Sequence, residues 1–245
     1  LGAALGSFLN VLIDRLSTGR AFVKGRSYCE HCKKTLKAVD LLPLISYLLL
    51  SGKCRYCKRK IPFRLFLIEL IVASIAVACF YFVILGSISP LSALTLFFIL
   101  YAFLGILSAD IQYGIIPDLL VGISLFSTTF YIFVNNLPFY NHLLSALGCF
   151  AFFLVLFIIT KGRGMGFGDV KFSFVLGFLL GFPLAIVSLY LAFLTGAFIA
   201  IILVLCRKIR FFGGSIPFGP FLVVATVISL FYGQEILSMF LARFF

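Results

Sequence analysis

Four cysteines and a few acidic residues are the side chains in this 245-residue sequence whose types and spacing could do chemistry. Cys29 and Cys32 form one CxxC pair, Cys54 and Cys57 form a second, and 21 residues separate the two pairs. A CxxC turn aims two thiolates at one point, and two such turns complete a tetrahedral shell for zinc. Because four cysteines close that shell, we expect a structural zinc site rather than a catalytic one.

The chain has only eight acidic residues, so each can be weighed. Asp110 lies at the end of one apolar segment, and Asp169 follows the glycine-rich stretch Gly164–Gly168. Two carboxylates can hydrolyse a peptide bond when one takes a proton from water and the other, protonated, polarises the scissile carbonyl. Glycines before Asp169 let the backbone turn tightly and leave room for an extended substrate. We therefore expect Asp110 and Asp169 to form an aspartic catalytic pair that only the fold can bring together.

Each of these acids also has a purely structural interpretation. Asp169 could cap the N-terminus of the next helix, and Asp110 could be a solvated helix end. Asp118 follows Pro117 directly before an apolar segment, which is a good helix start signal, and here the structural interpretation is the stronger one.

Glu69 lies about one turn inside another apolar segment. Its side chain could reach the membrane interface or pair with Arg64 or Lys60. Alternatively, it could form a polar wall of the active-site cavity.

The elements that must position these residues are membrane helices. The sequence is 63% hydrophobic and 11% charged, whereas soluble domains have about 45–50% apolar and about 25% charged residues. Uncharged runs approach the ~20 residues that cross a bilayer, and helices satisfy their own backbone groups in lipid. We predict an all-α polytopic protein with about eight transmembrane helices. These are expected near residues 1–13, 65–86, 91–109, 119–135, 143–160, 170–182, 184–206 and 218–242.

The distribution of basic residues predicts the orientation of these helices. Residues 14–64 hold 13 of the 20 Lys and Arg residues and three acids, a net charge of +10. Basic loops lie on the cytoplasmic side, where a disulfide is unlikely to persist and where anionic lipid headgroups offer a partner. Nucleic acid is not expected as a partner. Alternation also places most of the remaining basic residues inside: Lys161, Arg163, Lys171, Arg207, Lys208 and Arg210, with Arg243 outside.

The sequence therefore predicts that the chain is divided into three parts. Residues 1–13 are expected to be the tail of a first transmembrane helix that is N-terminally incomplete. Residues 14–64 form a basic cytoplasmic module, resembling a zinc ribbon, around the four cysteines. Residues 65–245 form a membrane-embedded aspartic peptidase domain.

Five motifs occur in the order that a known family shows. They are Gly6–Val11 (GSFLNV), the two CxxC pairs with Asp40–Tyr47 (DLLPLISY) between them, Asp110 with Pro117-Asp118 (D-x6-P-D), Gly164–Lys171 (GMGxGDxK), and Ile216–Phe221 (IPFGPF). The chain thereby resembles the type IV prepilin peptidases, which also serve type II secretion and competence systems. One departure is Arg64–Glu69, which reads RLFLIE where the family often has RYPLVE.

The resemblance implies a GxGD-type aspartic peptidase with catalytic residues Asp110 and Asp169. It implies removal of a short basic leader from pilin-like precursors, typically after a Gly, at the cytoplasmic face of the bacterial inner membrane. Many members also methylate the new N-terminus with S-adenosylmethionine. We expect five further residues around the substrate: Gly166, Gly168, Lys171, Glu69 and Asp118.

Two other functions compete with this one. A proton-coupled transporter also uses membrane carboxylates, but it predicts acids near the bilayer midplane and repeated halves, and the sequence shows no internal repeat. A zinc-dependent membrane scaffold without chemistry would leave the glycine-rich approach to Asp169 unexplained. Replacing Asp169 separates these possibilities, because only the peptidase loses precursor cleavage.

Overall fold

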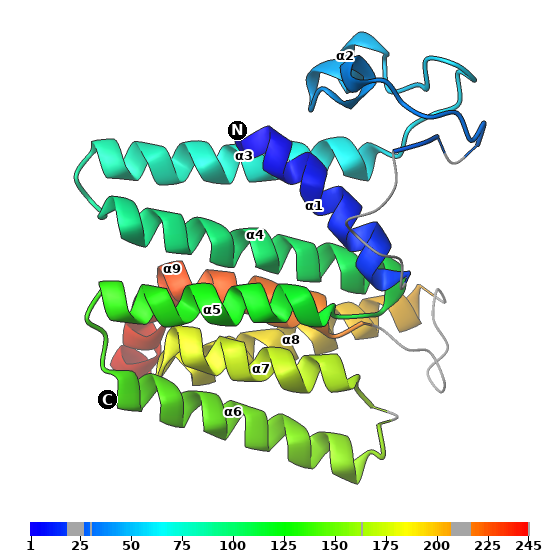
Figure 1. The fold of residues 1–245 in the computed structure, drawn as a ribbon. Coiled ribbons are helices and arrows are strands. Elements are labelled where there is room, and N and C mark those ends of the chain that lie inside the picture. Colours follow the sequence, from blue (N-terminus) through cyan, green and yellow to red (C-terminus); the bar gives the residue numbers. More distant parts are fainter. Residues whose placement is uncertain (19–26, 30, 163, 207–216, 245) are drawn as a thin grey trace. The chain divides into compact units, whose positions relative to one another are not determined.

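The computed structural model describes residues 1–18, 27–29, 31–162, 164–206 and 217–244, and over these residues the chain is helical. The described part contains no strand, only two isolated β-bridges. Each of the eight predicted segments overlaps a long helix (Figure 1). These are α1 (Gly2–Ser17), α3 (Phe63–Ile84), α4 (Pro90–Tyr113), α5 (Asp118–Val134), α6 (Phe139–Ile159), α7 (Phe167–Leu180), α8 (Leu184–Leu205) and α9 (Gly219–Phe244). The short helices η1 (Ala38–Leu41) and α2 (Ile45–Leu49) lie between α1 and α3.

Some of the predicted features lie outside the described residues. These are the basic residues Arg163, Arg207, Lys208 and Arg210, the side chain of Arg243, and Ile216 of the IPFGPF motif.

Five of the described helices are long and apolar enough to cross a membrane: α3, α4, α6, α8 and α9. The chain is therefore a multi-pass membrane protein. Their outer faces carry large apolar side chains, such as Phe80 on α3 and Phe198 on α8, which are 67% and 63% exposed. Such surfaces suit lipid, since soluble proteins rarely expose large contiguous apolar patches. Because α1, α5 and α7 have only 16, 17 and 14 residues, the count of eight spans stays a prediction.

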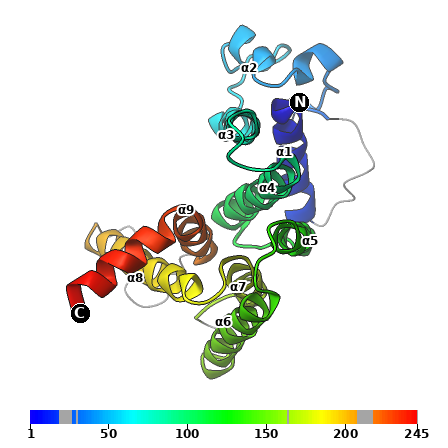
Figure 2. The same cartoon turned by 90° about the vertical axis from the view of Figure 1, so that its left-hand side faces the viewer.

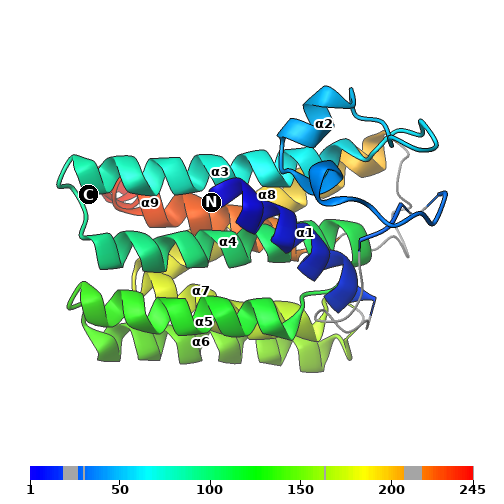
Figure 3. The same ribbon diagram turned by 45° about the horizontal axis from the view of Figure 1, so that its top comes forward.

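The chain divides into two compact units, Leu1–Phe97 and Phe98–Phe245. In the first unit α1 packs against α3 (Figure 3). Glycine permits this close approach, because a Cβ on Gly6 would lie 2.7 Å from Cα of Glu69. Asn10 Nδ2 donates a hydrogen bond to the Leu65 carbonyl oxygen across the same contact, at 3.0 Å. The GSFLNV motif thus supplies the small and polar residues that join α1 to α3.

Helix α7 is the centre of the second unit, where it packs against α5, α6, α8 and α9 (Figure 2). Side chains all around it are buried, including Phe172, whose ring meets that of Phe103 on α4 at a centroid distance of 5.1 Å. The closest approach is to α6, where a Cβ on Gly177 would lie 2.6 Å from the Ser145 carbonyl oxygen. The helix that carries Asp169 is therefore held on several sides.

Two predicted boundaries need correction because they affect the candidate site. Helix α4 continues to Tyr113, so Asp110 lies within its last turn rather than at its end. Helix α7 begins at Phe167 and not at residue 170, so Asp169 lies in its first turn. The predicted division between the segments 170–182 and 184–206 is confirmed, because α7 ends before Gly181, whose φ of +67° favours glycine.

Candidate active site

Asp110 is buried at the point where α4 meets the start of α9. The residue is 6% exposed, and its Oδ2 atom has no hydrogen-bond partner within the described residues. A Cβ on Gly219, the first residue of α9, would lie 2.5 Å from this oxygen. The Gly219 backbone therefore lies directly against the Asp110 carboxylate.

Asp169 divides its two carboxylate oxygens between different environments. Its Oδ2 atom accepts a hydrogen bond from the Gly166 backbone N–H at 3.2 Å, which caps the first turn of α7. Its Oδ1 atom is buried and has no partner in the described part of the chain. Asp169 is therefore not the N-cap residue that the sequence suggested, since Gly166 holds that position, but one of its oxygens still helps to cap the helix from the first turn.

The fold brings the two acids together from helices that are far apart in the sequence. Both lie in the second unit, both residues are 6% exposed, and they are close enough for direct electrostatic interaction. Burying two interacting carboxylates that have no ion-pair partner among the described residues is costly, and such pairs occur where one proton is shared between them. The arrangement has the elements that acid–base hydrolysis of a peptide bond needs.

Asp118 and Lys171 form an ion pair between α5 and α7. Asp118 is the first residue of α5, as the Pro117-Asp118 signal predicted, and its Oδ1 atom accepts a bond from Lys171 Nζ at 2.6 Å. The two side chains are 76% and 37% exposed. They line an open groove of about 350 Å³ with residues of α5, α6 and α7. The pair therefore joins the starts of α5 and α7 at the surface.

Glu69 contacts neither of its predicted basic partners. Its Oε2 atom accepts a hydrogen bond from the Leu44 backbone N–H at 2.8 Å, while Arg64 pairs with Asp14 at 3.6 Å. Leu44 immediately precedes α2, so this bond ties the cysteine-containing segment to α3. Glu69 also lines a cavity of about 470 Å³ inside the first unit.

The four cysteines of the first unit converge on one point. Their sulfur atoms all lie within 4.8 Å of one another, and Cys29 Sγ is 3.9 Å from Cys57 Sγ. A tetrahedral zinc with Zn–S bonds of about 2.3 Å separates its sulfurs by about 3.8 Å, so the cluster fits a metal ion. The Cys32 backbone N–H lowers the pKa of the Cys29 thiol to about 7. The pKa of the Cys57 thiol is instead raised to about 11, because the lowering effect of the Arg59 backbone N–H is outweighed by desolvation and the neighbouring thiols, so the case for a metal rests on the geometry of the four sulfurs.

The two CxxC turns have the same local construction. The backbone N–H of Cys29 donates to the Lys34 carbonyl, and that of Cys54 donates to the Arg59 carbonyl, five residues ahead in both cases. One isolated bridge closes each turn, Tyr28 with Thr35 and Lys53 with Lys60. The hairpins of a zinc ribbon are therefore reduced to single bridges among the described residues.

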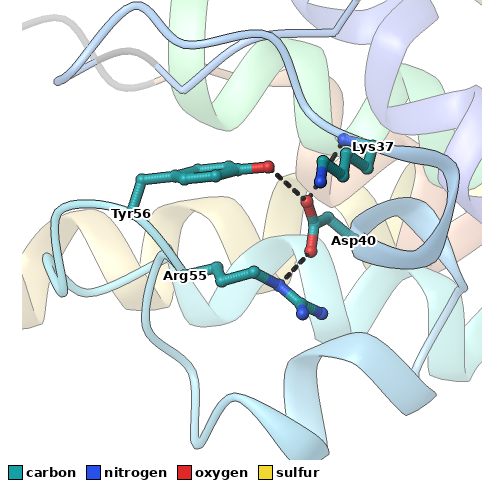
Figure 4. Close-up of polar contacts among 4 residues, drawn as sticks. All are labelled: Lys37, Asp40, Arg55 and Tyr56. Atoms are coloured by element: carbon teal, nitrogen blue, oxygen red, sulfur yellow. Dashed lines mark hydrogen bonds and ion pairs between the residues drawn. The ribbon is translucent and has the colours of Figure 1, made fainter.

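Asp40 stabilises the segment that carries the four cysteines, a role that the sequence interpretation missed (Figure 4). Its side chain is 3% exposed and pairs with Arg55 at 2.6 Å. It also accepts bonds from the Lys37 backbone N–H at 3.1 Å and the Tyr56 hydroxyl at 3.3 Å. Desolvation opposes its ionisation, but the Lys37 and Arg55 donors outweigh this and lower the pKa of the Asp40 carboxyl. Its place in the DLLPLISY motif, between the cysteine pairs, was the available signal.

Comparisons with known proteins agree with the five sequence motifs and extend over nearly the whole chain. The bacterial peptidase A24 N-terminal domain matches residues 1–83, and the type IV leader peptidase family matches residues 98–201. A prepilin leader peptidase/N-methyltransferase of Aeromonas hydrophila is 32% identical, covering 98% of this chain and 91% of the relative. Proteins of the same name are 29% identical in Bacillus subtilis (98% and 95% covered) and 27% identical in Pseudomonas aeruginosa (98% and 91%).

No solved structure matches the chain at the same level of significance. The two matched domains follow each other in the order of the motifs, and the relatives are covered almost from end to end. The chain therefore belongs to the type IV leader peptidase family.

Proposed function

We propose that this protein is a membrane-embedded aspartic endopeptidase that removes the leader peptide of type IV prepilin-like precursors. The observation that carries the proposal is the buried, interacting pair Asp110 and Asp169. Family membership supports the reaction class, because the similar proteins are named prepilin leader peptidases. The transporter alternative predicts repeated halves, and neither the sequence nor the comparisons support it.

The proposed reaction uses the two carboxylates in different protonation states. The ionised Asp takes a proton from a water molecule, whose oxygen attacks the scissile carbonyl carbon, while the protonated Asp donates its proton to the carbonyl oxygen. Collapse of the tetrahedral intermediate breaks the C–N bond, and the leaving amine takes up a proton from the pair. A helical substrate must unwind first, because its carbonyls are hydrogen-bonded. Gly166 and Gly168 would leave space for the extended strand.

We place the reaction at the cytoplasmic face of the bacterial inner membrane. The support is the positive-inside rule applied to residues 14–64, together with the position of both acids near helix ends. Gly166, Gly168, Lys171 and Asp118 lie at the starts of α5 and α7 and remain proposed substrate-binding residues. Membrane lipid is the expected surroundings, and no nucleic-acid partner is proposed.

Cleavage of a defined precursor tests the proposal. Purified protein in detergent is incubated with a prepilin-like substrate that carries a basic leader, a glycine and an apolar helix, and leader loss is read by mass. We expect Asp110→Asn and Asp169→Asn to lower the rate at least about 100-fold, because each removes a proton-transfer group. Glu235→Gln, at an exposed acid of α9, is the matched control. Near-normal cleavage by either Asp variant would refute the aspartic mechanism.

The structural metal is proposed to be zinc, held by Cys29, Cys32, Cys54 and Cys57. Four thiolates close its coordination shell, so it would fold the module without taking part in hydrolysis.

The N-methyltransferase in the names of the relatives suggests a second activity. We propose S-adenosylmethionine as the methyl donor, which would supply its sulfonium methyl group to the new N-terminal amine. The cavity of the first unit has about 470 Å³, within the range of about 300–1,000 Å³ typical of small-molecule sites. Three residues of its lining would hold such a donor: the Glu69 carboxylate its positively charged sulfonium, Arg59 its carboxylate, and Tyr47 its adenine ring. Equilibrium dialysis should show weaker donor binding by Glu69→Gln than by Glu235→Gln.

A further inference from the structure

The connection between α4 and α5 places one buried side chain against the backbone beside both aspartates. Ile116 is 8% exposed. A Cβ on Gly168, the residue before Asp169, would lie 2.9 Å from Ile116 Cβ. A Cβ on Gly219, whose backbone lies against Asp110, would lie 3.3 Å from Ile116 Cδ1. Ile116 therefore touches the start of α7 and the start of α9 at the two positions next to the acids.

The connection that carries Ile116 is itself fixed at both ends. Gly114 ends α4 with a φ of +65°, and its backbone N–H donates to the Asp110 carbonyl oxygen at 2.9 Å. At the other end, Asp118 pairs with Lys171 at 2.6 Å. The first turn of α7 is thus contacted by this connection on both sides of Asp169, through Gly168 and through Lys171. Ile116 cannot move without displacing one of these segments.

We infer that Ile116 is a positioning residue that sets the spacing between Asp110 and Asp169, an inference that rests on the proposed peptidase function. Its branched side chain packs against Gly168 and Gly219, which have no side chain that could move to relieve a close contact. Close-packed interiors transmit such contacts as displacements of the backbone rather than absorbing them. A displacement of about 1 Å can cost a catalytic site about 100-fold in rate. An ordinary core residue would contribute stability alone.

Ile132 provides the matched comparison, since it is also a buried isoleucine of the second unit. It is 1% exposed on α5 and packs in a cluster with Ala146 and Phe178. Ile132→Ala removes the same atoms as Ile116→Ala but leaves the contacts of Gly168 and Gly219 intact. The two variants therefore separate loss of packing from loss of positioning.

The test measures kcat and KM for leader cleavage by the purified full chain, at a temperature where thermal unfolding shows every variant to be folded. Ile116→Ala should lower kcat about 10–100-fold with little change in KM. Ile116→Val keeps Cβ and Cγ1, the two atoms nearest Gly168, but loses the Cδ1 next to Gly219, so it should restore only part of kcat. Ile132→Ala should lower the unfolding temperature and leave kcat close to that of the original chain.

The inference is overturned if Ile116→Ala has an unchanged kcat, or loses activity only in proportion to stability, as Ile132→Ala does. Should Ile116→Ala fail to fold, Ile116→Leu decides the matter, because it keeps the volume but moves the branch from Cβ to the γ carbon, which lies beside Gly168. A lowered kcat in folded Ile116→Leu supports positioning, and an unchanged kcat overturns it. Failure of the proposed function is a distinct result, namely cleavage by Asp110→Asn or Asp169→Asn.

Discussion

At the scale of single residues, Asp169 combines a structural and a proposed chemical role in one carboxylate. Oδ2 accepts the Gly166 N–H and so fixes the side chain relative to the start of α7. Oδ1, buried without a partner among the described atoms, remains able to bind a proton or a water molecule. A carboxylate that is oriented by one oxygen and reactive through the other needs little reorganisation during the reaction.

A bell-shaped pH dependence of kcat/KM is the expected signature of this pair. At low pH both carboxylates bind protons and no base remains, whereas at high pH the shared proton is lost and no acid remains. The two limbs belong to the coupled pair and not to either residue. Leader cleavage should be measured from acidic to alkaline pH, with unfolding followed in parallel. A rate that stays level on the alkaline side, while the protein stays folded, would argue against a shared proton.

Asp40 should stabilise the cysteine module in a pH-dependent way. Its folded-state pKa is lowered below the unfolded value of about 3.9. Its contribution is therefore complete above that value and is lost as pH falls through the folded pKa. Hydrogen exchange over residues 37–41 should show more protection in the original chain than in Asp40→Asn at neutral pH. The difference in protection between the two proteins should vanish in strong acid. Equal protection at neutral pH would contradict a stabilising role of Asp40.

At the scale of elements, α5 and α7 are joined at their first turns by an exposed ion pair. Side chains 76% and 37% exposed are screened by solvent, and such pairs contribute about 0–1 kcal/mol. Asp118→Ala should therefore keep cleavage within about fivefold of the original rate. Asp169→Asn in the same assay gives the scale of a catalytic loss. A comparable loss in Asp118→Ala would mean that this acid takes part in the reaction.

The first residue of α9, Gly219, has to be a glycine because its backbone lies against the Asp110 carboxylate. Gly219→Ala would place a Cβ 2.5 Å from Asp110 Oδ2, so the carboxylate or the helix must shift. We expect about a 100-fold loss of cleavage, since a 1 Å displacement of catalytic groups has that effect. Gly148→Ala, on α6, is the matched control, because its added Cβ would meet nothing within 4 Å. Equal rates of cleavage by the two variants would show that Gly219 has no role in the active site.

At the scale of the whole molecule, the cysteine cluster and the acidic pair belong to different units. The cysteines lie in Leu1–Phe97 and both aspartates in Phe98–Phe245. The three-part division at residues 13 and 64 stays a prediction. The boundary between the two compact units falls within α4. Because the cysteines and the aspartates lie in separate units, we expect that substitutions can change the stability of the first unit without changing the proposed chemistry of the second.

Elemental analysis should find about one zinc ion per chain, as one four-cysteine shell holds one ion. Replacing all four cysteines by serine should remove the metal and lower the unfolding temperature, because metal binding supplies folding free energy to a module with few apolar residues. The rate of cleavage per folded molecule should change little. Cys206→Ser, at an exposed cysteine outside the cluster, should retain the metal. A metal-free preparation of unaltered stability would refute the structural role.

The sequence by itself determined the helices, the cysteine cluster and the family of this protein. Apolar runs, Pro117-Asp118 and the Gly181 turn are local signals, because hydrophobicity and backbone preference act over a few residues. Two CxxC pairs carry their geometry within each turn, so their convergence could be expected from spacing. Helix ends were less certain, and α4 and α7 both extend further toward the acids than the apolar pattern indicated.

Only the tertiary structure decided how the acids meet and what surrounds them. Asp110 and Asp169 come together because α4 meets α7 through Phe103 and Phe172, and because Ile116 packs against both Gly168 and Gly219. Such packing depends on shape complementarity between distant segments. Some contacts join residues that are far apart in the sequence and that no local sequence pattern connects. They are the contacts of Ile116 with Gly168 and Gly219, and the hydrogen bond from the Leu44 backbone to Glu69. Spacing along a chain records local geometry, whereas the separation of two carboxylates is set by how whole helices pack.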